Sequence, residues 1–307
     1  MKVGLKLHHS GAGASPDEMR RWAHFAESLG IHLLMTADHV ALTPDVLKQY
    51  PAPYYEAFTN LAWLAAQTQR IKLGTTVVVV PYRHPIGLAT LVANVDQLSG
   101  GRFILGVGVG WSEPEFEALG VDFHQRGAIM DDYLDAAKAL WTNDVASYEG
   151  PFVSFRDVML SPKPVQSPHP PIWVGGASNV ATRRTARVGD AWHPLGIRVG
   201  WLKDTGLPRL QRLADREGRP VPSLCPRILC HLTDSPLPDD ERVAGEGTLD
   251  QVRGDLEALQ ALGAEYVVLD TKRNSPTSAL PTHHEEAFRT LTLLAEKAVD
   301  LEKETVR

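Results

Sequence analysis

Short apolar segments alternate with longer amphipathic ones from one end of the chain to the other. The first apolar segment, Val3 to His8, predicts a strand. Ser15-Pro16-Asp17-Glu18 then predicts the start of a helix, because serine caps free amides, proline fits the first turn and the glutamate completes a capping box. Apolar residues recur at helical spacing until Leu29-Gly30, where the glycine indicates the end of that helix.

The same strand-then-helix unit is predicted eight times. The predicted strands are Val3–His8, Ile31–Thr36, Ile71–Val80, Phe103–Val109, Ile172–Val174, Ala191–His193, Ser223–Leu232 and Tyr266–Leu269. The predicted helices span about 16–29, 58–64, 86–98, 126–141, 179–188, 201–216, 249–262 and 284–302. This alternation favours an α/β fold, either a (β/α)₈ TIM barrel or an open doubly wound sheet, and eight units favour the closed barrel. We expect a single barrel domain over residues 1–307.

One proline-rich segment, at about 142–170, interrupts the alternation. It contains a hairpin-like stretch from Ser147 to Phe152. We expect it to be an insertion after the fourth helix that covers the mouth of the barrel.

Composition narrows the class of partners. The 307 residues carry 31 basic and 37 acidic side chains, a net charge of −6, with both signs interspersed, so nucleic acid is not an expected partner. No apolar run approaches the roughly 20 residues that span a bilayer, and the chain starts directly on a strand, so we expect neither a membrane segment nor a signal peptide. The two cysteines, Cys225 and Cys230, are not spaced as a redox or zinc motif, and we expect a cytoplasmic protein.

Polar residues whose side chains can take part in catalysis follow several predicted strands. In a barrel, the active site lies at these carboxyl ends of the strands. These residues include His8, Asp38-His39, His193 and Asp270. Histidine is the side chain most often used for proton transfer near neutral pH, and His39 is our candidate for that role. The same residues allow an alternative, a metal-dependent hydrolase with Asp270 and the histidines as ligands. Against it, His8 and His9 are adjacent on one strand and face opposite sides, so the pair cannot share one metal ion.

Two glycine-rich segments follow predicted strands. Gly106-Val107-Gly108-Val109-Gly110 is not a dinucleotide-binding motif, because Trp111 stands where the third glycine is required. These glycines either leave room for a flat ring or allow tight packing within the barrel. Gly175-Gly176-Ala177-Ser178 opens a helix, where free amides and a hydroxyl favour a phosphate, with Arg183 or Arg184 within reach of the anion. Ser178 is also explained as a simple helix cap.

Taken together, these segments resemble the bacterial luciferase-like monooxygenase superfamily, and within it the branch of deazaflavin-dependent oxidoreductases. The resemblance covers about two-thirds of the chain. The matching segments are Thr36-Ala37-Asp38-His39, Ile71 to Val77, Asp96 to Arg102, Gly106 to Trp111, Pro162 to Gln166, Pro171 to Gly176 and Gly189 to Trp192.

The resemblance implies a barrel with FMN or the deazaflavin coenzyme F420 lying across the strand ends. It places the cofactor phosphate on Gly175, Gly176, Ala177 and Ser178, and it places His39 beside the reacting centre. It also implies a bulge at Thr76-Val77, often with a non-proline cis peptide, behind the ring. The ring would be bordered by Asp38, Thr76, Val77, Val109 and Gly110. A homodimer through helices of the early barrel is implied as well.

Two departures from the family pattern bear on the substrate. Trp111 occupies the place where sugar-phosphate dehydrogenases of the superfamily carry a glutamate, so we expect a small aromatic or otherwise apolar substrate instead. His8 stands where proline is common, and it is either a second proton-transfer group or a filler. We expect His8, Trp111, His193 and the segment from Ala41 to Tyr55 to contribute to the substrate pocket. The branch resemblance favours coenzyme F420 over FMN, and Arg183, Arg184, Arg187 and Lys163 offer a basic path for the anionic tail of F420.

Overall fold

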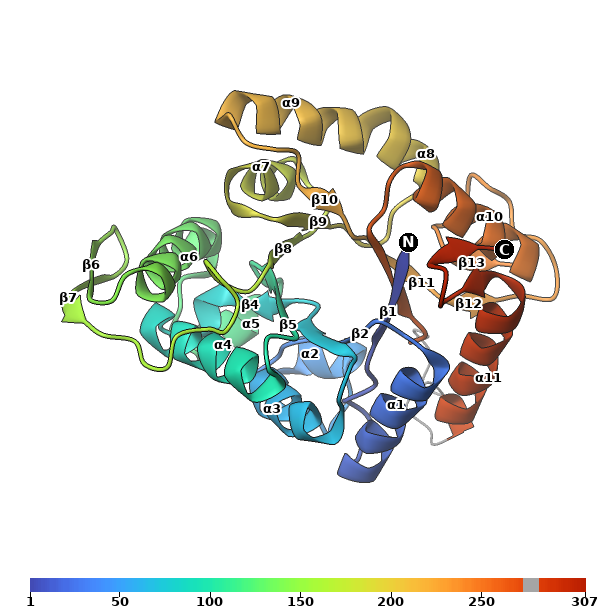
Figure 1. The fold of residues 1–307 in the computed structure, drawn as a ribbon, viewed down its shortest axis with the longest axis horizontal. Helices are drawn as coiled ribbons and strands as arrows, with labels where there is room; N and C mark the ends of the chain where they lie inside the picture. Colours follow the sequence, from blue (N-terminus) through green and yellow to red (C-terminus); the bar gives the residue numbers. More distant parts are fainter. Residues whose placement is uncertain (273–281) are drawn as a thin grey trace.

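The computed structural model describes residues 1–272 and 282–307 and shows a sheet of parallel strands surrounded by helices (Figure 1). The strands around the barrel are β1 (Lys2–Lys6), β2 (Leu33–Thr36), β3 (Lys72–Thr75), β5 (Phe103–Gly108), β8 (Ile172–Gly175), β9 (Ala191–His193), β10 (Ser223–Leu224) with β11 (Arg227–Leu229), and β14 (Tyr266–Asp270). Their order along the sheet is β10-β9-β8-β5-β3-β2-β1-β14-β11, and every neighbouring pair is parallel.

The seventh strand closes the barrel. Its two pieces, β10 and β11, are separated by Cys225 and Pro226; β10 pairs with β9, whereas β11 pairs with β14. The Cys225 amide donates to the Trp192 carbonyl, and the Val268 amide donates to the Pro226 carbonyl, so the ladder continues across the break. Pro226 has no amide hydrogen to donate, which explains why the strand is interrupted there. The predicted (β/α)₈ barrel is therefore confirmed.

In the described part of the chain, eight helices wrap the outside of the barrel (Figure 1). They are α1 (Pro16–Leu29), α3 (Ala57–Gln67), α4 (Pro85–Ser99), α6 (Arg126–Thr142), α7 (Asn179–Val188), α9 (Leu207–Glu217), α10 (Leu249–Ala261) and α11 (Thr282–Lys297). The first shows why the sequence predicts them well: the Ser15 hydroxyl accepts from the Glu18 amide, and Gly30 ends the helix at φ 87°. No helix in the described ranges is long and apolar enough to cross a membrane.

Shorter elements lie between these units. They are α2 (Pro44–Gln49), β4 (Val78–Val79), η1 (Val80–Tyr82), α5 (Glu113–Ala118), η2 (Phe123–Gln125), β6 (Ala146–Glu149), β7 (Ser154–Val158), α8 (Val199–Trp201), the π-helical turn η3 (Leu202–Gly206), β12 (His231–Leu232), β13 (Glu246–Gly247), β15 (Val299–Asp300) and β16 (Thr305–Val306). Several boundaries differ from the prediction; the strand predicted over Ser223–Leu232, for example, is divided into β10, β11 and β12. The strand predicted to reach Val80 ends at Thr75, and the closing helix ends at Lys297 because the chain then forms the β15–β16 hairpin.

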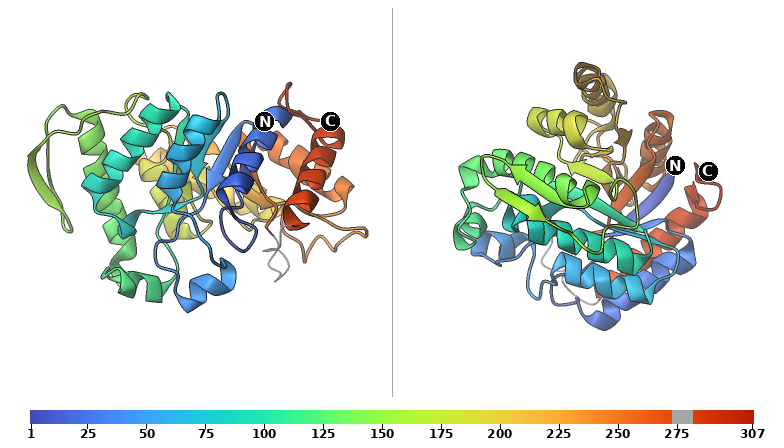
Figure 2. Two further views of the ribbon diagram at one scale, coloured as in Figure 1. Left: turned by 90° about the horizontal axis from the view of Figure 1, so that it is seen from below. Right: turned by 60° about the vertical axis from the view of Figure 1, so that its left-hand side comes forward.

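The insertion lies away from the barrel mouth, so that part of the prediction is wrong. The antiparallel hairpin β6–β7 does form, but it packs on α6, where the Asp132 carboxylate accepts from the Phe152 and Val153 amides. The Lys163 ammonium donates to the Leu140 carbonyl near the end of α6. A helix in this fold runs antiparallel to the strands, so an insertion that leaves the end of α6 starts from the face opposite the mouth. Figure 2 shows the hairpin projecting from the side of the molecule.

The mouth is covered instead by the segment that contains α2. The Lys272 ammonium, after β14, donates to the Gln49 carbonyl, and Ser10 pairs with Tyr54 in an isolated bridge. In the left view of Figure 2, α2 lies at one end of the barrel and both chain termini lie at the other.

Inward-facing side chains form a buried cluster inside the barrel, on the side of the mouth that faces the strand N-termini. Its members are Leu33, Met35, Ile104, Trp173, Ala191, Cys225, Tyr266 and Val268. Because alternate residues of a strand face the same side, the next inward positions toward the mouth are polar in several strands. They are Lys6, Thr76, His193, Arg227 and Asp270. The apolar barrel interior thus ends in a polar floor at the mouth.

Candidate active site

His39, after β2, is bound to a buried glutamate that the sequence analysis did not single out. The His39 Nδ1 lies 2.6 Å from Glu115 Oε2, and Glu115, in α5, is completely buried. The other carboxylate oxygen accepts from the amides of Val40 and Ala41, at 2.7 and 3.0 Å. Tyr82 donates its hydroxyl to Oε2 at 2.9 Å. Four donors therefore surround this carboxylate.

The charge of Glu115 fixes the tautomer of His39. Burial alone raises the pKa of Glu115, but the hydrogen bonds from His39 and the Val40 amide outweigh burial, and the net pKa is lowered. An ionised carboxylate accepts only, so the hydrogen between Glu115 and His39 belongs to Nδ1. The opposite nitrogen, Nε2, is then the one available for proton exchange.

Aromatic rings surround His39. The ring centroids of Tyr50, Tyr54 and Trp111 lie 5.0, 5.6 and 5.6 Å from that of His39. Trp111 is 42% exposed, so it presents an apolar face at the mouth. The hydroxyl of Tyr54 is buried and has no hydrogen-bond partner within the described residues. The structure thus brings His39 and Trp111 together, as the sequence analysis expected of a substrate pocket.

The carboxylate of Asp38, the neighbour of His39, forms hydrogen bonds and an ion pair within the protein. Its carboxylate forms a bidentate pair with Arg83, at 2.7 and 2.8 Å, and accepts from the Val79 amide at 2.9 Å. The Arg83 guanidinium also binds Glu56. Asp38 therefore anchors the segment after β3 at the mouth, and its predicted contact with a cofactor ring remains a prediction.

A chain of hydrogen bonds crosses the floor of the mouth. The peptide bond between Thr76 and Val77 is cis, as the resemblance implied. Arg227 donates to the Thr76 carbonyl and hydroxyl at 2.8 and 3.0 Å, and the Thr76 hydroxyl lies 2.8 Å from His193 Nε2. His193 Nδ1 lies 2.5 Å from the Cys225 carbonyl, so Nδ1 carries the hydrogen and Nε2 accepts from Thr76.

His193 is a neutral part of this floor. Burial, with the nearby charge of Arg227, lowers its pKa to about 3. The residue is 1% exposed and both ring nitrogens are bonded within the protein. A direct contact with substrate, which the sequence analysis expected, remains untested and requires one of these bonds to break.

The glycines of β5 are explained by packing. A Cβ atom on Gly106 would lie 1.8 Å from the Thr75 carbonyl oxygen, and one on Gly108 would lie 2.5 Å from a methyl group of Val77. Gly110 has φ +75°, and its Cβ would meet Val79 and Phe116. Of the two explanations left open by the sequence, close packing against the cis peptide segment accounts for Gly106 and Gly108.

A cavity of about 420 Å³ opens beside the N-terminus of α7. Gly175, Ser178 and Val109 line it, so three predicted cofactor-binding residues do come together. The Ser178 hydroxyl accepts from the Ala181 amide and caps the helix. Gly176 has φ +101°, and a Cβ there would lie 3.2 Å from Ala181. The partly buried Ala177 lies between them.

Arg126, which the sequence analysis missed, is one of two arginines that line this cavity, the other being Arg184. Arg126 lines the cavity together with His124, and its Nε is buried without a hydrogen-bond partner among the described residues. Its guanidinium lies 3.8 Å from the centre of the Phe123 ring, which positions the side chain. An unpartnered guanidinium nitrogen beside a helix N-terminus fits a phosphate.

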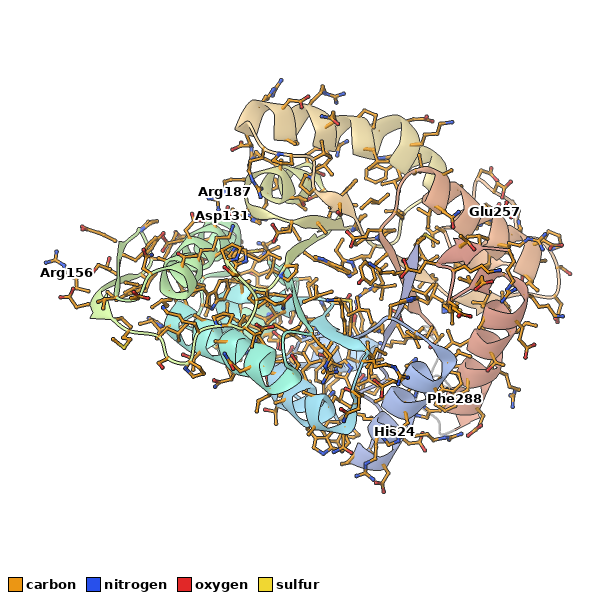
Figure 3. The ribbon with its side chains drawn as sticks, viewed as in Figure 1. His24, Asp131, Arg156, Arg187, Glu257 and Phe288 are labelled. Atoms are coloured by element: carbon orange, nitrogen blue, oxygen red, sulfur yellow. The ribbon has the colours of Figure 1, made fainter. Side chains whose placement is uncertain are left out.

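The basic path proposed for an anionic tail does not form. Arg184 is paired with Asp131, and Arg187 is paired with Asp131 and Asp135 (Figure 3). Lys163 lies at the opposite end of the barrel, bound to the Leu140 carbonyl. Only Arg183 of the four is exposed. The acidic residues that neutralise these arginines belong to α6, far from α7 in the sequence, so the sequence alone did not reveal the pairs.

His8 lies at the end of β1 in a separate contact network. Its Nε2 is 2.7 Å from the Thr271 hydroxyl, and its ring stacks on Trp22 with centroids 4.9 Å apart. The structure does not bring His8, His39, His193 and Asp270 together as one ligand set. Within the described residues, no group of three His, Cys, Asp or Glu side chains has the arrangement of a metal site.

Comparison with known proteins decides the family. The model of the luciferase-like monooxygenase family matches residues 2–237. The chain belongs to this family. The resemblance to the luciferase-like monooxygenase superfamily is therefore confirmed, and the deazaflavin branch remains a prediction.

Two curated proteins illustrate the similarity of the chain to known sequences. The chain is 36% identical over 160 residues to the oxygenase component of a flavin-dependent trigonelline monooxygenase of Acinetobacter baylyi, covering 52% of this chain and 42% of that protein. It is 34% identical over 205 residues to an uncharacterised protein of Mycobacterium tuberculosis, covering 62% and 71%.

Solved structures share the barrel. A monooxygenase from Streptomyces bottropensis matches with a TM-score of 0.75 at 24% identity, covering 96% of this chain and 98% of that one. An F420-dependent secondary alcohol dehydrogenase matches with a TM-score of 0.76 at 15% identity, covering 92% and 97%. At these identities the likeness shows the fold alone.

Several residues of this luciferase-like site escaped sequence analysis. They are Glu115, Arg126, Lys6, Arg227 and Lys272. Lys6 offered a signal, because a lysine inside an apolar strand at an inward-facing position is unusual. Glu115 offered none, because it belongs to a short helix that only the folded chain places beside His39.

Proposed function

We propose that this luciferase-like protein is a flavin-dependent oxidoreductase that transfers a proton through His39 at the barrel mouth. The observation that carries the proposal is the buried Glu115 carboxylate bound to His39 Nδ1 at 2.6 Å. A carboxylate in this position holds an imidazole in one tautomer and stabilises its protonated form.

The cavity at the N-terminus of α7 supports FMN as the cofactor. Gly176, Ser178 and Arg126 would hold its phosphate, because helix amides and an unpartnered guanidinium nitrogen favour a dianion. The ring would lie over the floor formed by Thr76 and Arg227, with Val77, Val109, Gly110 and Asp38 at its border. A bound reduced flavin would supply electrons to oxygen or to the substrate.

The protein residues then have distinct roles. His39 would donate or accept the proton at Nε2, and Glu115 would hold it in position. Tyr50, Tyr54 and Trp111 would form an apolar wall against a small organic substrate and exclude water from the reacting centre. His193 would support the floor through Thr76, and His8 would contribute from the small neighbouring cavity that it lines with Tyr50.

FMN is favoured over coenzyme F420 in this proposal. The paired states of Arg184 and Arg187 remove the basic path that favoured F420. A named relative above 30% identity is a flavin-dependent monooxygenase. F420 remains the second candidate, because a deazaflavin would use the same phosphate and ring contacts.

A titration tests the cofactor. We expect FMN to bind at least tenfold more tightly than riboflavin, which lacks the phosphate, and more tightly than F420, as measured by calorimetry. Arg126→Met should abolish the preference for FMN over riboflavin, whereas Arg183→Met, which removes an exposed arginine of α7, should leave it unchanged. Binding of neither FMN nor F420 would contradict the proposed function.

We also propose that the protein is a cytoplasmic homodimer. The 307 residues include only two cysteines, as expected of a protein from a reducing compartment. Sedimentation equilibrium of the purified protein would measure the mass of the assembly and test the dimer.

A further inference from the structure

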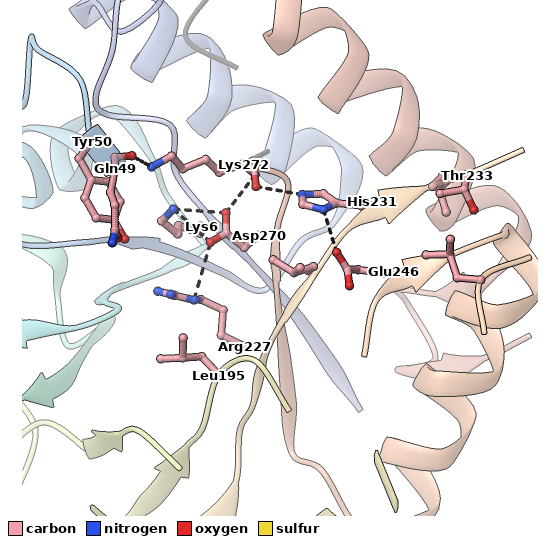
Figure 4. Close-up of a pocket in the computed structure, with 13 residues that line it drawn as sticks. Lys6, Gln49, Tyr50, Leu195, Arg227, His231, Thr233, Glu246, Asp270 and Lys272 are labelled. Atoms are coloured by element: carbon pink, nitrogen blue, oxygen red, sulfur yellow. Dashed lines mark hydrogen bonds and ion pairs between the residues drawn. The ribbon is translucent and has the colours of Figure 1, made fainter. Parts of the chain in front are cut away.

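A second cavity, of about 550 Å³, opens at the mouth on the side of β1, β11 and β14. Its inner end is formed by Lys6, Arg227, Asp270 and Lys272, and Tyr50 closes it from the α2 segment (Figure 4). Its outer part contains leucines and a polar rim. The leucines are Leu195, Leu229, Leu232 and Leu237.

The inner end holds three basic side chains around one carboxylate. The Lys6 ammonium lies 3.1 Å from an oxygen of Asp270, and the Arg227 Nε lies 3.7 Å from it. Asp270 also accepts the Lys272 amide at 3.0 Å. Lys6 is 5% exposed, so water screens its charge only weakly.

Asp270 does not balance this charge. Burial raises the pKa of Asp270, but Lys6 and Arg227 outweigh burial and lower it well below its ordinary value, so the carboxylate is ionised. It contributes one negative charge against Lys6, Arg227 and Lys272. At the outer rim, Glu246 lies 3.6 Å from His231 and does not reach the inner cations.

The Lys272 side chain contacts the α2 segment. Its ammonium lies 3.7 Å from the centre of the Tyr50 ring and donates to the Gln49 carbonyl. Burial, together with the charge of Lys6, lowers its pKa to about 7. A partly buried ammonium group that shares one carboxylate with two other cations is unfavourable, and an anion bound beside Lys272 would relieve that cost.

We propose that this cavity binds the carboxylate of an apolar or aromatic substrate between Lys272, Lys6 and Arg227, with the hydrocarbon part against Tyr50 and the leucines. The proposal rests on the proposed function, because it names the substrate class of the same site. Arg227 links this cavity to the proposed flavin site, since it contacts both Asp270 in the cavity and Thr76 in the floor. A carboxylate held here directs the rest of the substrate over the floor.

Calorimetric titration with cinnamate and its neutral isostere cinnamamide tests the proposal without turnover. We expect cinnamate to bind at least tenfold more tightly at pH 7. Lys272→Met should weaken cinnamate at least fivefold and leave cinnamamide unchanged. Lys297→Met, which removes an exposed lysine at the end of α11, is the matched control and should change neither. Asp270→Asn removes the competing negative charge and should tighten cinnamate binding.

The affinity for cinnamate should also depend on pH. The charged groups facing the Lys272 ammonium are Lys6 of β1, Arg227 of β11 and Asp270 of β14. A bound carboxylate favours the protonated amine, so affinity should fall as the pH rises from 6.5 to 8.5, and Lys272→Met should remove this dependence.

Equal binding of the two ligands, or binding of neither, overturns the proposal. Displacement of cinnamate by saturating FMN, or by inorganic phosphate, also overturns it, because the cations would then serve the cofactor phosphate. If FMN binds and cinnamate does not, the substrate class is wrong and the flavin function stands. If cinnamate binds and no flavin or deazaflavin does, the flavin function is wrong and the carboxylate-binding cavity stands.

Discussion

At the scale of single residues, Glu115 determines what His39 can do. A histidine exposed to water can lose the hydrogen from either ring nitrogen. The Nδ1 atom of His39 instead faces a buried carboxylate, which can only accept a hydrogen bond, so the hydrogen stays on Nδ1. The same carboxylate accepts two backbone amides, so it also holds the loop that carries His39. Position and protonation are therefore fixed by one side chain.

Replacement of Glu115 tests this arrangement. Glu115→Gln should lower kcat by about 10²-fold or more with little change in KM, because general acid–base groups supply about 10²–10⁴-fold. Tyr82→Phe removes one donor to the same carboxylate and should have a smaller effect. In a His39→Ala background, Glu115→Gln should cause no further loss of kcat. An additional loss there would mean that Glu115 acts independently of His39.

At the scale of elements, strand ends and helix starts assemble the cofactor cradle. β8 ends at Gly175, and α7 begins at Asn179 after the Ser178 cap, so the turn between them lies at the positive end of the helix dipole, with the Gly176 amide donating to the His193 carbonyl. Gly175 is also required for packing, because a Cβ there would lie 2.9 Å from Val77. Strand, cis peptide segment and helix therefore shape one site.

The turn before α7 can be tested with a charged side chain. Gly176→Glu should weaken FMN binding at least tenfold, about 1.4 kcal/mol, because it fills the cradle and repels the phosphate. Gly218→Glu is the matched control, because Gly218 also has a positive φ, of 63°, but lies at the end of α9 with open space around it. Both changes strain the backbone, so only the difference in FMN affinity reports on the cradle. Equal affinities would place the phosphate elsewhere.

At the scale of the whole molecule, burial of histidines ties stability to pH. Burial lowers the pKa of His193 to about 3 and that of His9 to about 4. The unfolded chain takes up a proton at each of these residues near pH 6.5, and the folded protein does not. Stability is therefore retained above about pH 6.5 and lost as the pH falls toward these lower values.

Urea unfolding between pH 7 and 5 measures this loss. Each extra proton bound by the unfolded chain lowers the free energy of unfolding by up to about 1.4 kcal/mol per pH unit. His193→Gln should reduce the fall between pH 6 and 5 by about 1 kcal/mol, even though the variant is less stable overall. His24→Gln, which changes an exposed residue of α1, should leave the slope unchanged (Figure 3). An unaltered slope in His193→Gln would show that His193 is protonated in the folded state.

The sequence by itself determined the strand and helix units and the closed barrel. These follow from local rules: Ser15 and Gly30 mark helix ends, and apolar periodicity separates strands from helices. It also identified the start of α7 after Gly175 and its cap at Ser178, because that signal is contained in consecutive residues.

Tertiary structure alone decided which charges meet. Glu115 reaches His39 across 76 positions, and Asp270 reaches Lys6 across 264. Asp131 neutralises Arg184 from another helix, which turned an expected basic path into a paired surface. The insertion likewise lies on α6, because the direction of that helix, and not its sequence, sets the face from which the insertion leaves. Electrostatic interactions depend on distance in space, which local patterns of sequence do not encode.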